Sequence, residues 1–252
     1  MNTPSKPIHL TLLFSIGLSC ATSALAGANL EPILTVPDAI VFRNDFSKSE
    51  PLAKGSWSLR QHTRWTIEEG VLRGIPSTLE YQNSRKDHQG FEPRISCPAT
   101  PAEFIADFSI RFNGGAETSI APFVEFGHHI ARVKFSESGI SLIADGESVK
   151  LDEDKGFKYE SGKWYHALAE LKGDEFVIQF ADGPTLYGKH PRFAQPVSSG
   201  GAGFGVAGTR GGVVEIDHLT LSTIKNQPNP GWKSTRKRFA PFEPIVLKEK
   251  KK

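Results

Sequence analysis

The chain has 252 residues and carries 30 Lys and Arg against 28 Asp and Glu, a formal net charge of +2. This small net charge argues against a dedicated nucleic-acid-binding protein, and the two cysteines exclude a disulfide-rich scaffold and a Cys-rich zinc site. The 17 Phe, the 24 Gly and the single Met favour β-structure.

The N-terminal segment, residues 1–26, is organised like a secretory signal peptide. Lys6 precedes an apolar stretch, Leu10–Leu18, which is too short to span a bilayer as a permanent helix. Ala24-Leu25-Ala26 has the small-residue pattern of a cleavage site. We therefore expect cleavage after Ala26 and export to the periplasm or the extracellular space, with no integral membrane segment left. A buried N-terminal helix is the alternative.

Cleavage at this position would leave a single cysteine in the mature chain. Cys20 would be removed, so Cys97 could form no internal disulfide. A lone cysteine in an exported protein is most often a buried, unreactive side chain, and we expect this of Cys97.

From residue 39 onward, short runs of β-forming residues alternate with turn sequences. Phe104–Phe112 has an apolar residue at every second position and polar residues between, as expected of a half-buried strand. Asp145-Gly146 and Asp182-Gly183 are typical of hairpin turns. The predicted strands are 39–46, 57–60, 65–67, 71–74, 104–112, 120–126, 129–135, 139–144, 164–171, 175–181, 203–207 and 213–221.

Clean helical stripes of apolar residues are missing from the sequence. Many short strands at close spacing predict an all-β sandwich or barrel, and argue against the α/β folds that bind nucleotides. The glycine-rich segment Gly200–Gly205 is followed by no predicted helix, so we expect it to be a turn that enters a strand.

Charge is divided unevenly between the body and the C-terminal end. Residues 233–252 carry eight basic and two acidic side chains, a net charge of +6, whereas residues 27–232 carry −5. The segment Asn226–Gly231 breaks the strand pattern and predicts a linker. The expected divisions are a lead-in at 27–38, one sandwich domain at 39–225, and a Pro- and Lys-rich linker with a basic tail at 226–252.

Three parts of the sequence carry a resemblance to a known family. They are Trp65–Gly74, with the pattern W-x-x-x-x-G-V-L-x-G; Gly162–His166, followed by a charged strand and a Gly-Asp turn; and Gly203–Val206 with Glu215–Leu219. Together they resemble the laminin-G-like, concanavalin-type jelly-roll superfamily. More narrowly, they resemble the 3-keto-disaccharide hydrolase domain family of bacterial secreted proteins, over roughly residues 39–224.

The resemblance implies a concanavalin-like jelly-roll sandwich of two antiparallel sheets and a carbohydrate or glycoside partner. It also implies a hydrolase or lyase acting on 3-keto-glycosides. A non-catalytic glycan-binding module and a cell-surface interaction domain on the same fold are the alternatives. The shared tryptophans and glycines shape turns and pack sheets, so we take the candidate site residues from this chain alone. Of the tryptophans, we expect Trp65 and Trp164 to lie in the core.

The densest cluster of polar residues is the segment EFGHHIAR, which begins at Glu125. A regular strand would separate the two histidines onto opposite faces, unless the glycine forms a bulge or tight turn that redirects one of them. Glu125 or a histidine would remove a proton from a keto-sugar, and Arg132 would stabilise the developing negative charge. The predicted catalytic residues are Glu125, His128, His129 and Arg132.

A divalent metal is a candidate cofactor at this cluster, with Glu125 and His129 as ligands. The alternative interpretation is structural, with one histidine in the core and the other on the surface.

Two further polar segments supply candidate substrate-binding residues. The stretch Pro76–Pro101 has little strand character, and long loops in compact domains often have a function. Tyr187–Arg192 is predicted to form a second polar loop. Their charged groups suit the hydroxyls of a sugar, although ordinary solvated connections would have the same composition. The predicted binding residues are Lys86, Asp87, His88, Arg94, Lys189 and His190.

Overall fold

The computed structural model describes residues 30–49, 51–52, 55–114, 122–195 and 203–247. The predicted signal peptide, its cleavage position and the last five residues of the basic tail lie outside these ranges. Among the described residues, no helix is both long and apolar enough to cross a membrane.

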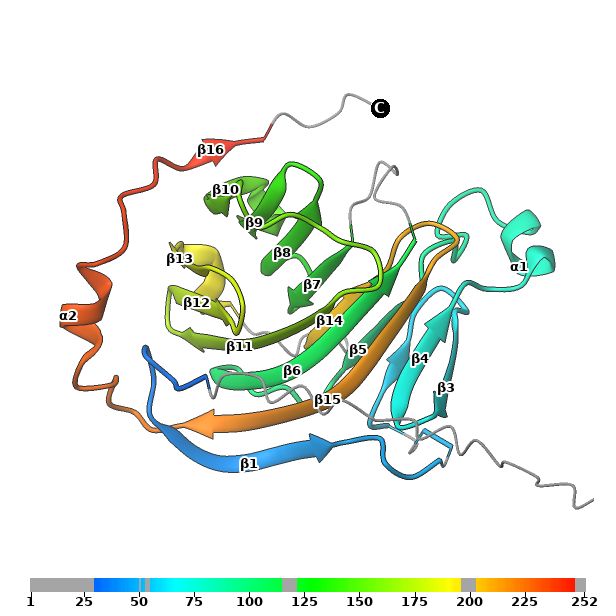
Figure 1. Ribbon diagram of the computed structural model, residues 1–252, viewed down its shortest axis with the longest axis horizontal. Helices are drawn as coiled ribbons and strands as arrows, with labels where there is room; N and C mark the ends of the chain where they lie inside the picture. The colour runs from blue at the N-terminus through cyan, green and yellow to red at the C-terminus, as the bar shows by residue number, and fades with distance from the viewer. Residues whose placement is uncertain (1–29, 50, 53–54, 115–121, 196–202, 248–252) are drawn as a thin grey trace, which may run out of the picture.

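Two antiparallel sheets facing each other form the described fold (Figure 1). Sheet A consists of β1 (Pro37–Asn44), β3 (Arg64–Glu68), β4 (Val71–Ile75), β6 (Phe104–Asn113), β11 (Trp164–Lys172), β12 (Glu175–Phe180), β13 (Thr185–Lys189) and β15 (Val213–Ile224). Its order is β13-β12-β11-β6-β15-β4-β3, and β1 pairs with the second half of β15.

Sheet B consists of β2 (Ser58–Leu59), β5 (Arg94–Cys97), β7 (Phe123–Phe126), β8 (Ala131–Ser136), β9 (Gly139–Ala144), β10 (Val149–Asp154), β14 (Phe204–Ala207) and β16 (Ile245–Val246). Its order is β16-β10-β9-β8-β7-β14-β5-β2. The chain crosses repeatedly between the sheets, as in a jelly roll. The predicted all-β sandwich of two antiparallel sheets is therefore confirmed.

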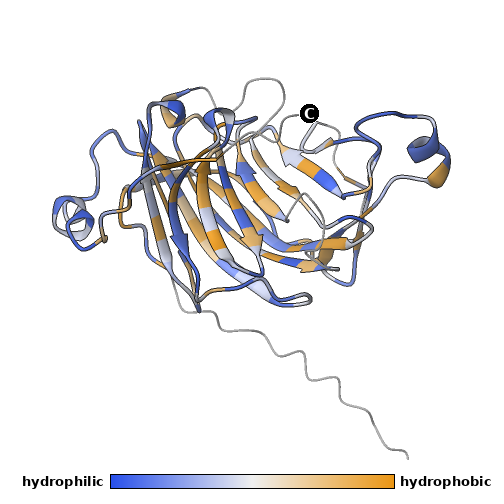
Figure 2. Ribbon diagram, turned by 90° about the horizontal axis from the view of Figure 1, so that it is seen from above, coloured by the Kyte–Doolittle hydropathy of each residue, from blue (hydrophilic) through white to orange (hydrophobic). Residues whose placement is uncertain are grey.

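Alternation along the strands builds the core between the sheets. On β6, Phe104, Phe108 and Phe112 are fully buried, whereas Asp107, Ser109 and Arg111 on the opposite face are partly exposed. The ring of Phe108 lies 5.0 Å from that of Phe204 on sheet B, measured between centroids, within the range of favourable aromatic contacts. Hydrophobic and hydrophilic residues accordingly alternate along the strands in Figure 2.

Four short helical segments complete the described fold. They are α1 (Leu79–Asn83), α2 (Trp232–Arg236) and the 3₁₀ turns η1 (Asp145–Glu147) and η2 (Pro191–Ala194). The stretch Pro76–Pro101 is not the strandless loop that was predicted, because it contains α1 and β5. The strands β10 and β13 were not predicted either. The polar segment Tyr187–Arg192 is only partly a loop, because its first three residues end β13 and its last two begin η2.

Segments near both ends of the described chain are fastened to sheet A. Glu170 on β11 is fully buried and accepts hydrogen bonds from the backbone N–H groups of Ile33, Leu34 and Thr35. The backbone N–H of Asn229 donates to the carbonyl of Leu34.

The segment that follows α2 also packs on the sandwich. Trp232 is buried and donates from Nε1 to Glu175, and the ring of Phe239 stacks on Tyr187. Farther on, β16 pairs with β10 at the edge of sheet B. The C-terminal segment therefore contacts the sandwich at intervals as far as Val246.

Candidate functional site

The polar segment that begins at Glu125 forms a hairpin on sheet B. The strand β7 ends at Phe126 and β8 begins at Ala131, so the strand predicted at 129–135 starts two residues later. Gly127 (φ +78°) and His129 (φ +59°) adopt left-handed backbone conformations that close the turn. Both histidines consequently lie in the turn, with their ring centroids 4.0 Å apart.

Alternation on the two strands selects which side chains reach the outer face of sheet B. Val124 and Val133 are buried in the core. Glu125 and Arg132 are therefore directed outward, and the register places them directly opposite each other. On the other side of Glu125, the neighbouring strand presents Gly205. A Cβ at that glycine would lie 3.1 Å from Cγ of Glu125, so the missing side chain makes room for the carboxylate.

Arg132 is the centre of the arrangement. Its Nη2 lies 3.2 Å from Oε2 of Glu125 and 2.8 Å from Oδ2 of Asp145. Its guanidinium carbon lies 3.9 Å above the ring centroid of Phe123. Because these three charged side chains are only 11–19 % exposed, their hydrogen bonds are less screened than at an open surface. One guanidinium thus holds two carboxylates side by side at the outer face.

Asp145 also orients a histidine. Its Oδ2 lies 2.7 Å from Nδ1 of His129, whose side chain is 52 % exposed. The backbone carbonyl of His129 accepts hydrogen bonds from the N–H of Gly146 and from Nε of Arg192. A carboxylate bound to Nδ1 restrains the imidazole ring, as in sites where a histidine acts as a general base.

A second arginine approaches the same aromatic ring. Arg94 on β5 lies with its guanidinium carbon 5.4 Å from the ring centroid of Phe123. Burial lowers the pKa of Arg94 from its ordinary value. Within the described part of the chain, Nε of Arg94 and Nε of Arg132 are buried without a hydrogen-bond partner. Each such donor costs about 1–3 kcal/mol unless a ligand or water bonds to it.

Two further groups near this cluster, Lys134 and His128, have lowered pKa values. Burial, together with the charge of Arg132, lowers the pKa of Lys134. Burial and the neighbouring His129 lower the pKa of His128. The environment thus makes the charged form of both groups less favourable than at an exposed position, as expected where several cations share a partly buried surface.

The other predicted binding residues lie at varying distances from this cluster. His190 faces Glu147 of η1, with 3.6 Å between Nε2 and Oε2, and so borders the site. Lys189 ends β13 and pairs with Asp174. His88 bonds to Gln61, and Lys86 and Asp87 are exposed in the same loop. Among the described residues, no hydrogen bond or ion pair joins these three to Arg132.

Three residues of the cluster were not predicted. The sequence indicates only that Asp145 lies in a hairpin turn, Phe123 in a strand and Arg192 in a loop. The alternation of Arg132 and Lys134 marks the outer face of β8, but it does not locate these three residues beside Arg132. The predicted metal ligands are engaged elsewhere, since Glu125 pairs with Arg132 and His129 with Asp145.

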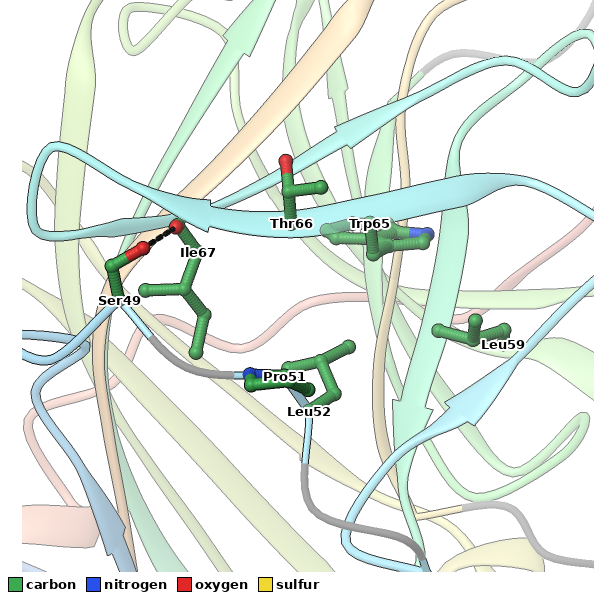
Figure 3. Close-up of a pocket in the computed structure, with 7 residues that line it drawn as sticks. All are labelled: Ser49, Pro51, Leu52, Leu59, Trp65, Thr66 and Ile67. Carbon is green, nitrogen blue, oxygen red and sulfur yellow. Dashed lines mark hydrogen bonds between the residues drawn. The ribbon is translucent and has the colours of Figure 1, made fainter.

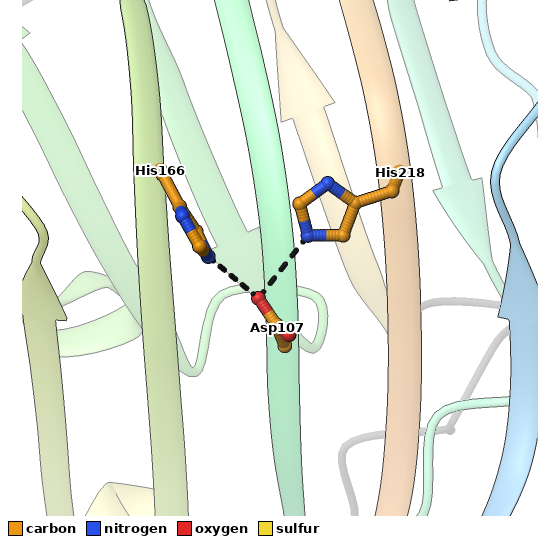
Figure 4. A group of neighbouring side chains, drawn as sticks. All are labelled: Asp107, His166 and His218. Carbon is orange, nitrogen blue, oxygen red and sulfur yellow. Dashed lines mark hydrogen bonds and ion pairs between the residues drawn. The ribbon is translucent and has the colours of Figure 1, made fainter. Parts of the chain in front are cut away.

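A second polar cluster lies on the outer face of sheet A. Oδ1 of Asp107 on β6 lies 2.9 Å from Nε2 of His166 on β11 and 3.2 Å from Nε2 of His218 on β15 (Figure 4). Burial alone would lower the pKa of His218, but Asp107 and Asp217 outweigh it and raise the pKa to about 9. Burial would raise the pKa of Asp107, but the two histidines outweigh it and hold that pKa well below its usual range.

Trp164 belongs to the same outer face and not to the core, contrary to the prediction. The residue that follows it, Tyr165, takes the core position. The guanidinium carbon of Arg111 lies 4.6 Å from the centroid of the Trp164 ring, and Nε of Arg111 lies 2.6 Å from Glu215. An aromatic ring and paired charges therefore continue the polar surface beyond His166.

An apolar pocket opens between β2 and β3 (Figure 3). Its polar atoms are already bonded, because Ser49 donates to the carbonyl of Ile67 and Thr66 to Glu68. The pocket therefore offers a hydrophobic surface with no titratable side chain in its lining. The residues that line it are Ser49, Pro51, Leu52, Leu59, Trp65, Thr66 and Ile67.

Comparison with known proteins yields structural similarity alone. No protein-family model matches the chain, and no curated protein matches it in sequence. A carbohydrate-binding module of class 66 from Bacillus subtilis is similar at a TM-score of 0.46 and 16% identity, over 67% of this chain and 96% of the module. A family 16 glycosyl hydrolase from Mycobacterium smegmatis is similar at a TM-score of 0.48 and 10% identity, over 73% of this chain and 100% of the hydrolase. Peanut lectin is similar at a TM-score of 0.47 and 10% identity, over 74% of this chain and 98% of the lectin.

Proposed function

We propose that this protein binds a glycan on the outer face of sheet B, with Arg132 at the centre of the site. The observation that carries the proposal is the Arg132 network, in which one guanidinium holds the carboxylates of Glu125 and Asp145 side by side on the outer face. Sugar hydroxyls both donate and accept hydrogen bonds, so they match a surface that offers charged donors and acceptors side by side.

The finer proposal is that the bound glycan is a 3-keto-glycoside and that the site acts on it. The carbonyl of such a sugar acidifies the neighbouring C–H bond. His129, held by Asp145 at 2.7 Å, would take that proton, and Arg132 would stabilise the negative charge that develops on the carbonyl oxygen. As the bond to the leaving oxygen breaks, a carbon–carbon double bond forms in the keto-sugar, and the protonated His129 returns its proton to that oxygen, so that the group leaves as a neutral alcohol.

Binding and turnover are tested separately. Binding is measured by calorimetry on a panel of glycans with the wild type, Arg132→Met and Glu125→Gln, with Ser141→Ala on the neighbouring strand as the matched control. We expect the two site variants to lose affinity by about 10-fold or more while the control does not. Equal affinity of all four proteins would overturn the assignment of the site.

Turnover is measured by release of the alcohol from 3-keto-glycosides, with His129→Ala and Asp145→Asn as variants. The catalytic proposal requires turnover by the wild type and a loss of about 10²-fold or more in both variants. Saturable binding without turnover would instead identify a non-catalytic glycan-binding module. If glycans fail to bind and deletion of residues 233–252 abolishes attachment to cells, the surface-contact alternative holds.

We also propose that the protein is exported and cleaved after Ala26. The support is the sequence of residues 1–26 alone. The mass of the protein recovered from the periplasm or the culture medium measures the cleavage position. A mature chain that begins at Gly27 is the expected result, and a full-length chain retained in the cytoplasm would refute it.

A further inference from the structure

Three adjacent strands of sheet A bring two imidazoles and a carboxylate together on the face that points away from the core. The order is β11, β6, β15, and Ser109 on β6 is the register partner of both His166 and His218. The histidines therefore flank the middle strand on either side. Asp107 lies on the same face as Ser109, two residues along β6, and both rings turn toward it (Figure 4).

A β-bulge places His218 on this face. The register of β15 against β6 shifts between Ile216 and His218, which leaves Asp217 as the extra residue. Without the shift, His218 would continue the buried series of Val214 and Ile216 and point into the core. The bulge moves the buried series to Leu219 and releases His218 to the outer face. Bulges are frequent where a strand must redirect a functional side chain.

The resulting geometry is that of a ligand set. The two nitrogens and the carboxylate oxygen all lie within 4.8 Å of one another. The side chains are 26–40 % exposed, so an ion can approach from solvent and retain open coordination positions. The carboxylate of Asp217 lies 3.7 Å from Nδ1 of His218, on the far side of that ring. A carboxylate near the second ring nitrogen is the usual outer partner of a metal-bound histidine.

We propose that Asp107, His166 and His218 form a binding site for a divalent transition metal, with zinc as the leading ion. Two imidazole nitrogens exclude calcium and magnesium, which prefer sets made of oxygen atoms, and suit zinc, copper and nickel. Three protein ligands leave at least one position for water or a ligand atom, the pattern of an open zinc site. This inference is independent of the site on sheet B.

Zinc chloride added to chelator-treated full-length protein is the probe. We expect one zinc per chain by calorimetry, and cobalt(II) at the same site to give the visible absorption of a tetrahedral N/O complex. His166→Ala, His218→Ala and Asp107→Asn should each weaken zinc binding by about 10-fold or more. The matched control is the double variant His128→Ala/His129→Ala, which removes the two histidines of sheet B and should bind zinc as the wild type does.

Thermal unfolding of each metal-free variant separates loss of ligands from loss of the fold. His166→Gln is the second variant at that position, because it keeps a hydrogen-bonding group beside Asp107. Weak binding by both His166 variants, with melting temperatures close to that of the metal-free wild type, supports the proposal. Wild-type protein that binds no zinc, or that binds it equally well in the His166→Ala/His218→Ala double variant, overturns it.

Discussion

The guanidinium of Arg132 rests on the ring of Phe123, with 3.9 Å between its central carbon and the ring centroid. Phe123 is 1 % exposed although it lies on the outer face of sheet B, because the guanidinium groups of Arg132 and Arg94 pack against its ring. Phe123→Leu should lower the free energy of unfolding by about 1–2 kcal/mol and weaken glycan binding, because Arg132 loses the stacking that fixes it. Urea unfolding and calorimetry measure the two effects.

Phe135→Leu is the matched control for that variant, since Phe135 lies on the core face of β8 and packs against Phe112 with tilted rings. It should lose comparable stability and keep glycan affinity. If both variants bind equally weakly, general destabilisation and not the contact with Arg132 explains the loss.

Gly205 leaves the space that Glu125 occupies. In Gly205→Ala the new Cβ would lie 3.1 Å from Cγ of Glu125 and 3.2 Å from the carbonyl oxygen of Ile95. The carboxylate must shift, and we expect weaker glycan binding with a stability loss of about 1 kcal/mol. Crystallography of the variant would show whether the distance from Glu125 to Arg132 has grown. Unchanged affinity would mean that Glu125 does not contact the glycan.

Glu170 ties the segment before β1 to the centre of sheet A. Its carboxylate accepts from three backbone N–H groups and from Oγ1 of Thr35, at 2.7–2.8 Å for the shortest. Glu170→Gln replaces one acceptor oxygen by a donor, so it should lower the free energy of unfolding by about 2–3 kcal/mol. Thr35→Val, which removes a single bond, should cost about 1 kcal/mol. Urea titrations of both variants test this ranking, and the reverse order would contradict it.

Cys97 should behave as an inert thiol in the folded protein. It is fully buried, and burial raises the pKa of its thiol to about 11. The reactive thiolate is disfavoured at pH 8, and rising pH should restore reactivity only as the pH approaches that pKa. A thiol-specific reagent should therefore modify Cys97 in proportion to the unfolded fraction along a urea series. Rapid, complete modification in native buffer at pH 8 would contradict the prediction.

The strands that the sequence predicts best are those with one buried and one exposed face. In β6 the alternation of Phe and polar residues gives both the strand and its orientation. The missed strands have a different origin. β10, with the sequence VKLDED, has no sustained apolar face, and β5 has only four residues. Their strand geometry comes from hydrogen bonds to neighbouring strands, which are not local to the sequence.

Both outer-face clusters contain side chains whose proximity cannot be predicted from a single sequence. The proximity of Glu125 and Arg132 could be predicted because one short hairpin joins them. Asp145 comes from the end of another strand, and only the packing of η1 against the turn brings it to His129. One signal for His218 was present nevertheless. The buried residues of β15 change from even to odd positions after Ile216, and such a change of phase indicates a bulge.

Contacts between early and late segments of the chain also determine when folding can be completed during synthesis. Leu34, Val177 and Trp232 form one small apolar cluster, and β1 pairs with the end of β15. These contacts link residues almost two hundred positions apart, so a ribosome must synthesise the chain beyond Trp232 before they can form. Folding with such high contact order is slow. The sandwich can therefore be completed only after nearly the whole chain has been synthesised, although its hairpins need no residues from the C-terminal segment.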